Sequence, residues 1–241
     1  MNAIIFAAGL GTRLKPLTND RPKALVEVNG KSLLEHNILK LKKDGFEHIV
    51  VNVHHFGKQI IDFIADKKCF GIDIKISDEQ DLLLDTGGGI RKALKLFDND
   101  DPVLVHNVDI ISTIDLHSIY QNHKDSKAEA TLCVAQRDTS RYLLFNEEMR
   151  LRGWTNINTG EVKGEKAINQ LAFSGIHIIN KSLCIKLEEY PQEVFPIMDF
   201  YLSTASSCNY QGLVLPEDTK WVDCGKQESL KKASVILDSL C

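Results

Sequence analysis

The chain has 241 residues with a formal net charge of -4, and 43% of the residues are hydrophobic. This composition is ordinary for a globular protein with a substantial core, and no basic field points to nucleic acid as a partner. No apolar run approaches the ~18 residues of a membrane span, and the N-terminus lacks a signal-peptide pattern, so we expect a cytoplasmic protein with no membrane partner. None of the six cysteines forms a C-x-x-C pair, which argues against a zinc knuckle or a redox dithiol.

The first half of the chain predicts strands and helices in alternation. The apolar run 2–8 is typical of a buried parallel strand, and Ser32 with Glu35 predicts a capping box at the start of a helix. Further strands are predicted at 48–53, 72–76 and 103–105, and further helices at 56–66 and 90–97. This β-α-β-α order favours a parallel sheet with helices on both faces.

The pattern loosens after about residue 127. Strands that could pair antiparallel are predicted at 130–135, 142–145 and 173–179, helices near Lys181 and Pro196, a short strand at 221–223 and a last helix at 227–240. We interpret the whole chain as one α/β domain whose second half lays a substrate-side lobe over the first.

A loop rich in glycine and cations follows the first predicted strand. Gly9 and Gly11 let the backbone approach a ligand closely and turn its N–H groups inward. Four cations fall within eleven residues, namely Arg13, Lys15, Arg21 and Lys23. Ligands of open α/β sheets bind at the carboxyl ends of the strands, which is where this loop lies. The loop is predicted to grip the phosphates of a nucleoside triphosphate, with a solvated basic turn as the alternative.

Two common nucleotide motifs are excluded. A dinucleotide fingerprint needs a glycine where this chain has Leu14. Gly30-Lys31-Ser32 supplies the end of a Walker P-loop, but the first glycine of that pattern is replaced by Leu25. The phosphate loop therefore belongs to neither class.

Three glycines in succession, Gly87 to Gly89, open a predicted helix after Asp85-Thr86. Glycine at such positions costs backbone entropy, so we expect something to pass close to the main chain there. A flat nucleobase or ribose fits this expectation, and a flexible helix start is the alternative.

One aspartate follows a predicted strand, and another ends a predicted strand. Asp109 comes directly after the buried strand that ends near His106, and Asp223 lies in the apolar segment 221–225. Mg²⁺ takes oxygen ligands, often one or two carboxylates with phosphates completing its shell. Alone, each aspartate is more often a cap or turn residue, but together with the first loop they indicate a metal site.

These motifs together resemble the sugar-1-phosphate nucleotidyltransferases. The run AAGLGTRLKPLTNDRPKALVEVNGKSLLEH is similar to the N-terminal signature of that family, and DTGGGI, NVD, FSGIHII and WVDCG follow in the family's order. The resemblance covers almost the whole chain. It is closest to the N-acetylmuramate-1-phosphate uridylyltransferases and the mannose-1-phosphate guanylyltransferase-like enzymes.

The resemblance implies a Rossmann-like three-layer α/β/α fold with a mixed, mainly parallel sheet. It divides the single domain into a nucleotide-binding half, 1–127, and a sugar-side half, 128–241. It also implies Mg²⁺ as cofactor, a nucleoside triphosphate and a sugar 1-phosphate as substrates, release of pyrophosphate, and a monomer or homodimer. UTP is favoured as donor and GTP with mannose 1-phosphate is the alternative. An acceptor such as phosphocholine, or a nucleotide sensor without turnover, also stays open.

Site residues follow from the same resemblance. The nucleotide would be bound by Ala8, Gly9, Gly11, Thr12, Arg13, Lys23, Thr86, Gly87 and Gly88. The sugar phosphate would be bound by Asn107, Ser174 and Gly175, the metal by Asp109 and Asp223, and catalysis would depend on Arg13, Lys23 and Asp109. The chain departs from the family at Val108, where glycine is usual. Valine would add bulk beside the metal.

Overall fold

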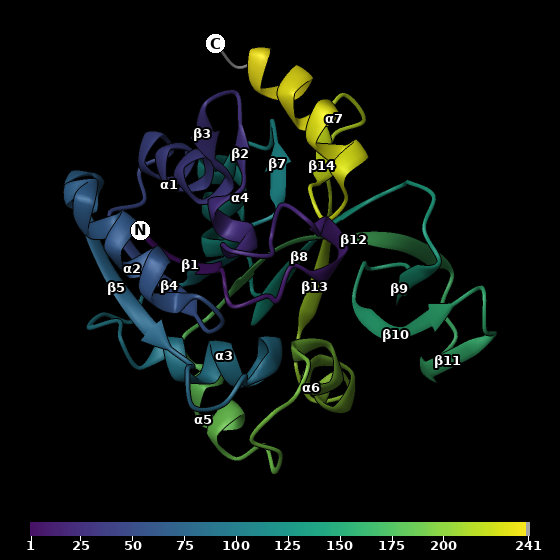
Figure 1. The fold of residues 1–241 in the computed structure, drawn as a ribbon. Coiled ribbons are helices and arrows are strands. Elements are labelled where there is room, and N and C mark those ends of the chain that lie inside the picture. Colours follow the sequence, from purple (N-terminus) through teal and green to yellow (C-terminus); the bar gives the residue numbers. More distant parts are fainter. Residues whose placement is uncertain (240–241) are drawn as a thin grey trace.

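The computed structural model describes residues 1–239, and its centre is one mixed sheet of ten strands (Figure 1). The strands are β1 (Asn2–Phe6), β4 (His48–Val53), β5 (Asp73–Asp78), β6 (Val103–Asn107), β8 (Ala130–Ala135), β9 (Arg141–Phe145), β10 (Leu151–Asn156), β11 (Glu161–Gly164), β12 (Asn169–Ile179) and β13 (Tyr210–Val214). They run in the order β11-β10-β9-β12-β6-β1-β4-β5, and β8 joins β12 to β13. The predicted α/β/α architecture is confirmed.

The core of the first half is parallel. β1 lies between β4 and β6, and β4 pairs with β5, all in parallel register. Successive side chains of β1 point to opposite faces, so Ala3 and Ile5 enter one hydrophobic core and Ile4 enters the other. A strand buried on both faces reads as an unbroken apolar run, which is why the sequence predicted it correctly.

Helices cover both faces of the sheet. The core that contains Ile5 is closed by α1 (Leu33–Lys43), α2 (Gly57–Asp66) and α4 (Leu116–Asp125). The core that contains Ile4 is closed by α3 (Asp85–Leu94), α5 (Leu183–Glu188) and α6 (Ile197–Thr204). No helix within residues 1–239 is long and apolar enough to cross a membrane.

The predicted cap of α1 is confirmed, because the Ser32 Oγ accepts a hydrogen bond from the Glu35 N–H at 3.1 Å. The helix α4 was not predicted, although Asp115 caps it and Leu116, Ile119 and Tyr120 form its buried face. Its mean hydropathy is low, so the apolar stripe is narrow.

Short elements complete the first half and the C-terminus. They are the 3₁₀ turns η1 (Thr12–Leu14), η2 (Lys23–Leu25) and η3 (Lys68–Gly71), and the antiparallel pair β2 (Glu27–Val28) and β3 (Lys31–Ser32). A second antiparallel pair joins β7 (Ile110–Ser112) to β14 (Trp221–Asp223), and α7 (Gln227–Asp238) packs against it. The last helix was predicted to reach Leu240, which lies outside the described residues.

The second half extends the same sheet. β12 pairs antiparallel with β6, as the looser pattern suggested, whereas β13 pairs parallel with β8. β12 begins at Asn169 rather than 173, and its first residues pair with β9. The strands β9, β10 and β11 form the lobe that projects to one side in Figure 1.

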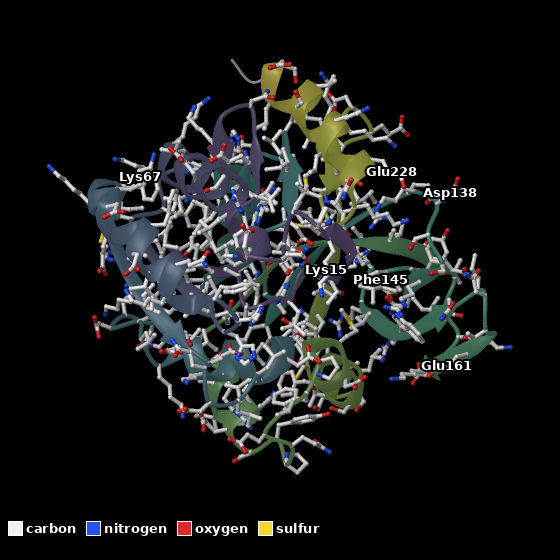
Figure 2. The ribbon with its side chains drawn as sticks, in the orientation of Figure 1. Lys15, Lys67, Asp138, Phe145, Glu161 and Glu228 are labelled. Carbon is white, nitrogen blue, oxygen red and sulfur yellow. The ribbon has the colours of Figure 1, made fainter. Side chains whose placement is uncertain are left out.

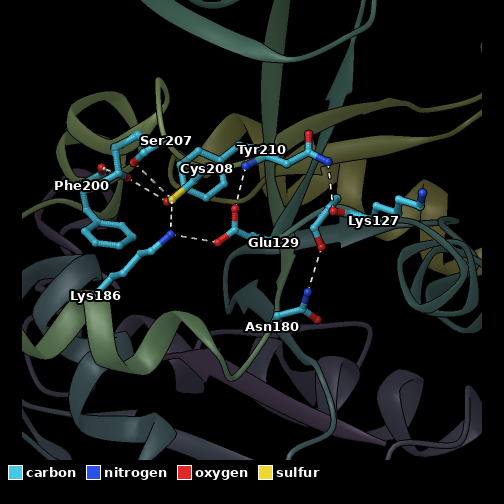
Figure 3. Close-up of polar contacts among 11 residues, drawn as sticks. Lys127, Glu129, Asn180, Lys186, Phe200, Ser207, Cys208 and Tyr210 are labelled. Atoms are coloured by element: carbon cyan, nitrogen blue, oxygen red, sulfur yellow. Dashed lines mark hydrogen bonds and ion pairs between the residues drawn. The ribbon is translucent and has the colours of Figure 1, made fainter.

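A cluster of polar side chains links the residue before β8 to α5 and to the residue before β13 (Figure 3). One carboxylate oxygen of Glu129 accepts from Lys186 Nζ at 3.0 Å, and the other accepts from the Asn209 N–H at 2.8 Å. Lys186 Nζ also lies 2.9 Å from the Cys208 sulfur. The Lys186–Glu129 pair is partly exposed, so it contributes little energy, but it fixes how these segments join.

His177 on β12 is buried without any polar partner. Its ring lies between those of Phe173 and Tyr201, and neither ring nitrogen has a hydrogen-bond partner within residues 1–239. Burial lowers the pKa of His177 to about 3. The imidazole is therefore neutral in the folded protein, whereas the unfolded chain takes up a proton below a pH of about 6.5.

Acid should therefore destabilise the fold through His177. Between pH 6.5 and 4 this residue alone lowers the free energy of unfolding by about 1.4 kcal/mol per pH unit, because only the unfolded state binds the proton. His177→Leu should flatten this dependence in urea titrations at pH 7.0 and 5.0. His117→Leu, at an exposed position, is the control. An equal loss of stability in wild type and His177→Leu would contradict the assignment.

Candidate active site

The carboxyl ends of β1, β4 and β6 meet at one edge of the sheet, and a cavity of about 430 Å³ opens there. The cavity is lined by Phe6, Ala8, Gly9, Lys23, Asn52, Glu79, Leu83, Asp85, Thr86, Asn107, Asp109 and Val194. Six of the predicted site residues are in this lining. The topology places them together because parallel neighbours end on the same side.

Lys23 and Asp109 form the central ion pair of the site. Lys23 Nζ lies 2.6 Å from Asp109 Oδ2, and the two side chains are only 15% and 10% exposed. Lys23 comes from the end of the predicted phosphate loop, and Asp109 comes from the segment after β6. A charge-assisted bond at this length ties the loop to the strand end.

Asp223 and Arg13 lie beside this pair. Asp223 Oδ1 accepts from the Gly225 N–H at 2.7 Å, and a Cβ on Gly225 would lie 2.5 Å from Arg13 Nη2. The glycine therefore lets the Arg13 guanidinium approach the carboxylate. The Cys224 N–H donates to the Asp109 main-chain oxygen at 2.8 Å, and Asp223 on β14 pairs with Ile110, the residue after Asp109.

The two aspartates suit a hard cation. Burial, followed by the negative charge of Asp109, raises the pKa of Asp223. A bound cation would relieve this repulsion. Within residues 1–239 no group of three or more His, Cys, Asp and Glu side chains could hold a metal. Mg²⁺ often takes only one or two carboxylates and completes its shell with phosphate and water oxygens, so its binding by this pair stays a prediction.

Asn52 and Glu79 are lining residues that the sequence did not reveal. Asn52 Oδ1 accepts from the N–H groups of Ala7 and Ala8 at 2.7 and 3.3 Å, and its Nδ2 donates to Glu79 at 2.9 Å. The other Glu79 oxygen accepts from the Leu84 N–H at 3.1 Å. These buried bonds hold the start of the phosphate loop. A polar residue inside the apolar strand 48–53 was the available signal for Asn52.

The glycines of α3 pack against segment 193–195 of the same chain. The Gly87 N–H donates to the Phe195 oxygen at 2.8 Å, and a Cβ on Gly88 would lie 2.5 Å from the Glu193 oxygen. Segment 193–195 thus provides the close approach that the sequence predicted. Of the nucleotide contacts predicted in this motif, only Thr86 lines the cavity, and its Oγ1 accepts from the Ile197 N–H at 2.9 Å. Contact of Gly87 or Gly88 with a base or ribose stays a prediction.

The remaining residues of the phosphate loop lie beside the cavity. Gly11 has a φ of 64°, which favours glycine, and its oxygen accepts from Thr18 Oγ1 at 2.9 Å. Thr12 then begins η1. These contacts lie within the loop itself.

The predicted sugar-side residues have different surroundings. Asn107 lines the cavity, and Gly175, with a φ of 76°, lets β12 pass close to it. The Ser174 side chain is buried, and its Oγ donates to the Cys133 oxygen at 2.8 Å. Its hydroxyl is therefore engaged within the sheet and does not point to the cavity.

Val108 does not obstruct the site. Its side chain is 1% exposed and packs in the core that contains Ile5, and its φ is not in the left-handed region. Its main chain is paired at both ends, donating to the Phe6 oxygen and accepting from Asn37 Nδ2. The bulk expected beside the metal lies in the core instead.

Comparisons with known proteins agree with this geometry. The chain matches the nucleotidyl transferase family over residues 2–239. It belongs to this family. Among its relatives, the N-acetylmuramate alpha-1-phosphate uridylyltransferase of Caulobacter vibrioides is 31% identical over 98% of this chain and 96% of that protein. Mannose-1-phosphate guanylyltransferase 1 of Arabidopsis thaliana is 30% identical over the whole chain, which spans 66% of the plant protein.

Solved structures show the same family fold. A putative glucose-1-phosphate thymidylyltransferase from Bacillus anthracis superposes with a TM-score of 0.81 at 18% identity, over 98% of this chain and 94% of that one. HddC from Yersinia pseudotuberculosis superposes with a TM-score of 0.76 at 22% identity, over 97% and 98%. The family resemblance drawn from the motifs is thus confirmed.

Two glycine substitutions should separate folding from ligand binding. Gly88→Ala should lower the free energy of unfolding by about 1–3 kcal/mol, because the new methyl group meets the Glu193 oxygen. Gly9→Ala should leave stability nearly unchanged, because its methyl group meets only the flexible end of Lys23 at 3.7 Å. It should instead weaken triphosphate binding. Urea titration and calorimetry with UTP measure the two effects, and equal stability of both variants would contradict the role given to Gly88.

Proposed function

We propose that this protein is a Mg²⁺-dependent nucleotidyltransferase that transfers a nucleoside monophosphate from a nucleoside triphosphate to a sugar 1-phosphate. UTP is the favoured donor and N-acetylmuramate 1-phosphate the favoured acceptor. The observation that carries the proposal is the buried Lys23–Asp109 pair at the strand ends, with Asp223 and Arg13 beside it. The substrate choice is supported by the Caulobacter vibrioides relative, which spans almost the whole chain.

The reaction is an in-line displacement. An oxygen of the sugar phosphate attacks the α-phosphorus of the triphosphate, the bond from the α-phosphorus to the bridging oxygen breaks, and pyrophosphate leaves with the electron pair. No covalent intermediate with the protein is needed. The protein therefore contributes by positioning both substrates and by stabilising negative charge.

The cations have distinct tasks in this proposal. Asp109 takes one of the three N–H donors of Lys23, which leaves the others for phosphate oxygens. Arg13 presents a planar fork of donors next to Asp223, suited to phosphate. Asp109 and Asp223 would hold Mg²⁺, which when bound neutralises charge on the phosphates.

One other substrate pair has specific support. The plant guanylyltransferases cover this chain from end to end at about the same identity as the Caulobacter vibrioides protein. GTP with mannose 1-phosphate is therefore the second candidate. A sensor without turnover was favoured only by Val108, and the core position of that side chain removes this reason.

A substrate matrix tests the proposal. We expect pyrophosphate release with UTP and N-acetylmuramate 1-phosphate to exceed that of every other pairing of four nucleoside triphosphates with a panel of sugar 1-phosphates. Removal of Mg²⁺ with a chelator should abolish it, and added Mg²⁺ should restore it.

Variants of the site test its residues in the same assay. Lys23→Ala, Asp109→Asn and Asp223→Asn should each lower turnover by about 10²–10³. Lys31→Ala, at an exposed position on β3, is the control. Near-normal turnover by Lys23→Ala or Asp109→Asn would defeat the assignment.

A further inference from the structure

Arg137 is a constrained cation that the predicted site did not include. It follows β8 in the loop that leads to β9, next to Asp138, which Figure 2 labels on the side of α7 and the β9–β11 lobe. Its guanidinium carbon lies 4.2 Å from the centre of the Trp221 ring, and its Nη2 donates to the Phe173 oxygen at 2.6 Å. Stacking on indole and a short hydrogen bond fix the plane of the group.

The hydrogen-bonding capacity of this guanidinium is largely unused. Arginine has five N–H donors, and the structure shows one hydrogen bond from them. Nε is buried and has no partner within residues 1–239. Buried donors without partners are rare in folded proteins and indicate a ligand or a water.

The position of Arg137 relates it to the reaction centre. Trp221 and Asp223 are alternate residues of β14, so they share a face about 6.6 Å apart. The Arg137 charge attracts the Asp223 carboxylate. Arg13, by contrast, lies over Gly225, on the other side of Asp223 along the chain. The charges of two guanidinium groups therefore act on this carboxylate, one from each half of the protein.

Strand β12, on the predicted sugar side, accepts hydrogen bonds from both Arg137 and Trp221. The Phe173 oxygen accepts from Arg137, and the next carbonyl, of Ser174, accepts from Trp221 Nε1 at 2.8 Å. The following residue, Gly175, abuts Asn107 in the cavity wall. Three consecutive residues of β12 thus connect the stacked guanidinium to the cavity.

We propose that Arg137 binds the phosphate of the acceptor and so determines that the acceptor is a phosphate monoester. Two substrates with phosphates meet at this site, and Arg13 and Lys23 already serve the triphosphate side. The Arg137 charge acts on the same carboxylate from the other half, and its donors match phosphate oxygens. This inference rests on the proposed function, because only a transfer reaction has such an acceptor.

Steady-state kinetics with UTP and N-acetylmuramate 1-phosphate tests the proposal. Arg137→Ala should raise the KM for the sugar phosphate by about 10- to 100-fold, with little change in the KM for UTP. Arg137→Lys should recover only part of the loss, since an ammonium cannot stack and fork in the same way. Arg141→Ala, at an exposed arginine of β9, is the matched control and should leave both values unchanged. An unchanged KM for the sugar phosphate, or an equal rise for UTP, would overturn the proposal.

A binding measurement keeps the test independent of turnover. The chain has two tryptophans, so Trp154→Phe leaves Trp221 as the only indole. Titration with the sugar phosphate should then change the Trp221 emission, and Arg137→Ala in this background should abolish the change. The same response with and without Arg137 would refute the inference. Absence of turnover for every substrate pair, with an Arg137-dependent emission change, would defeat the proposed reaction but retain the phosphate site.

Discussion

The parallel pairing of β1 with β6 is the constraint on which the site depends. Phe6 lies opposite Asn107 in this register, so the loop after one strand and the carboxylate after the other emerge side by side. About a hundred residues separate them in the chain, and main-chain hydrogen bonds bring them together. The Lys23–Asp109 bond then closes the loop over the strand ends.

Two antiparallel strand pairings join the second half of the protein to strands of the first half. β14 pairs with β7 and sets Asp223 next to the segment of Asp109. β12 pairs with β6 and extends the sheet toward the projecting lobe. Both contacts involve elements that directly precede or follow the residues of the cavity. The sugar-side half is thus positioned by β6 and β7, the two strands on either side of Asp109 in the chain.

Local signals predicted those parts of the structure that local physics decides. The buried strand β1 and the cap at Ser32 could be derived because apolar runs and cap chemistry act within a few residues. The segment that packs on the α3 glycines could not be derived in this way. A glycine shows that something comes close, but Phe195 and Glu193 come from about a hundred residues away. The polar partners of Ser174 and Glu79 could not be predicted either, since sheet register and tertiary packing set them.

Segment 193–195 packs on α3 through main-chain bonds, whereas one of its side chains forms part of the cavity wall. Phe195 bonds through its N–H to the Leu84 oxygen and through its oxygen to the Gly87 N–H, so the main chain holds the segment. Val194, between these anchored residues, lines the cavity and is 45% exposed. Its side chain can change without disturbing the bonds that hold it. An enzyme lineage can therefore alter the chemistry of this wall by point substitution while the architecture persists, which makes position 194 a natural place for substrate preference to diverge.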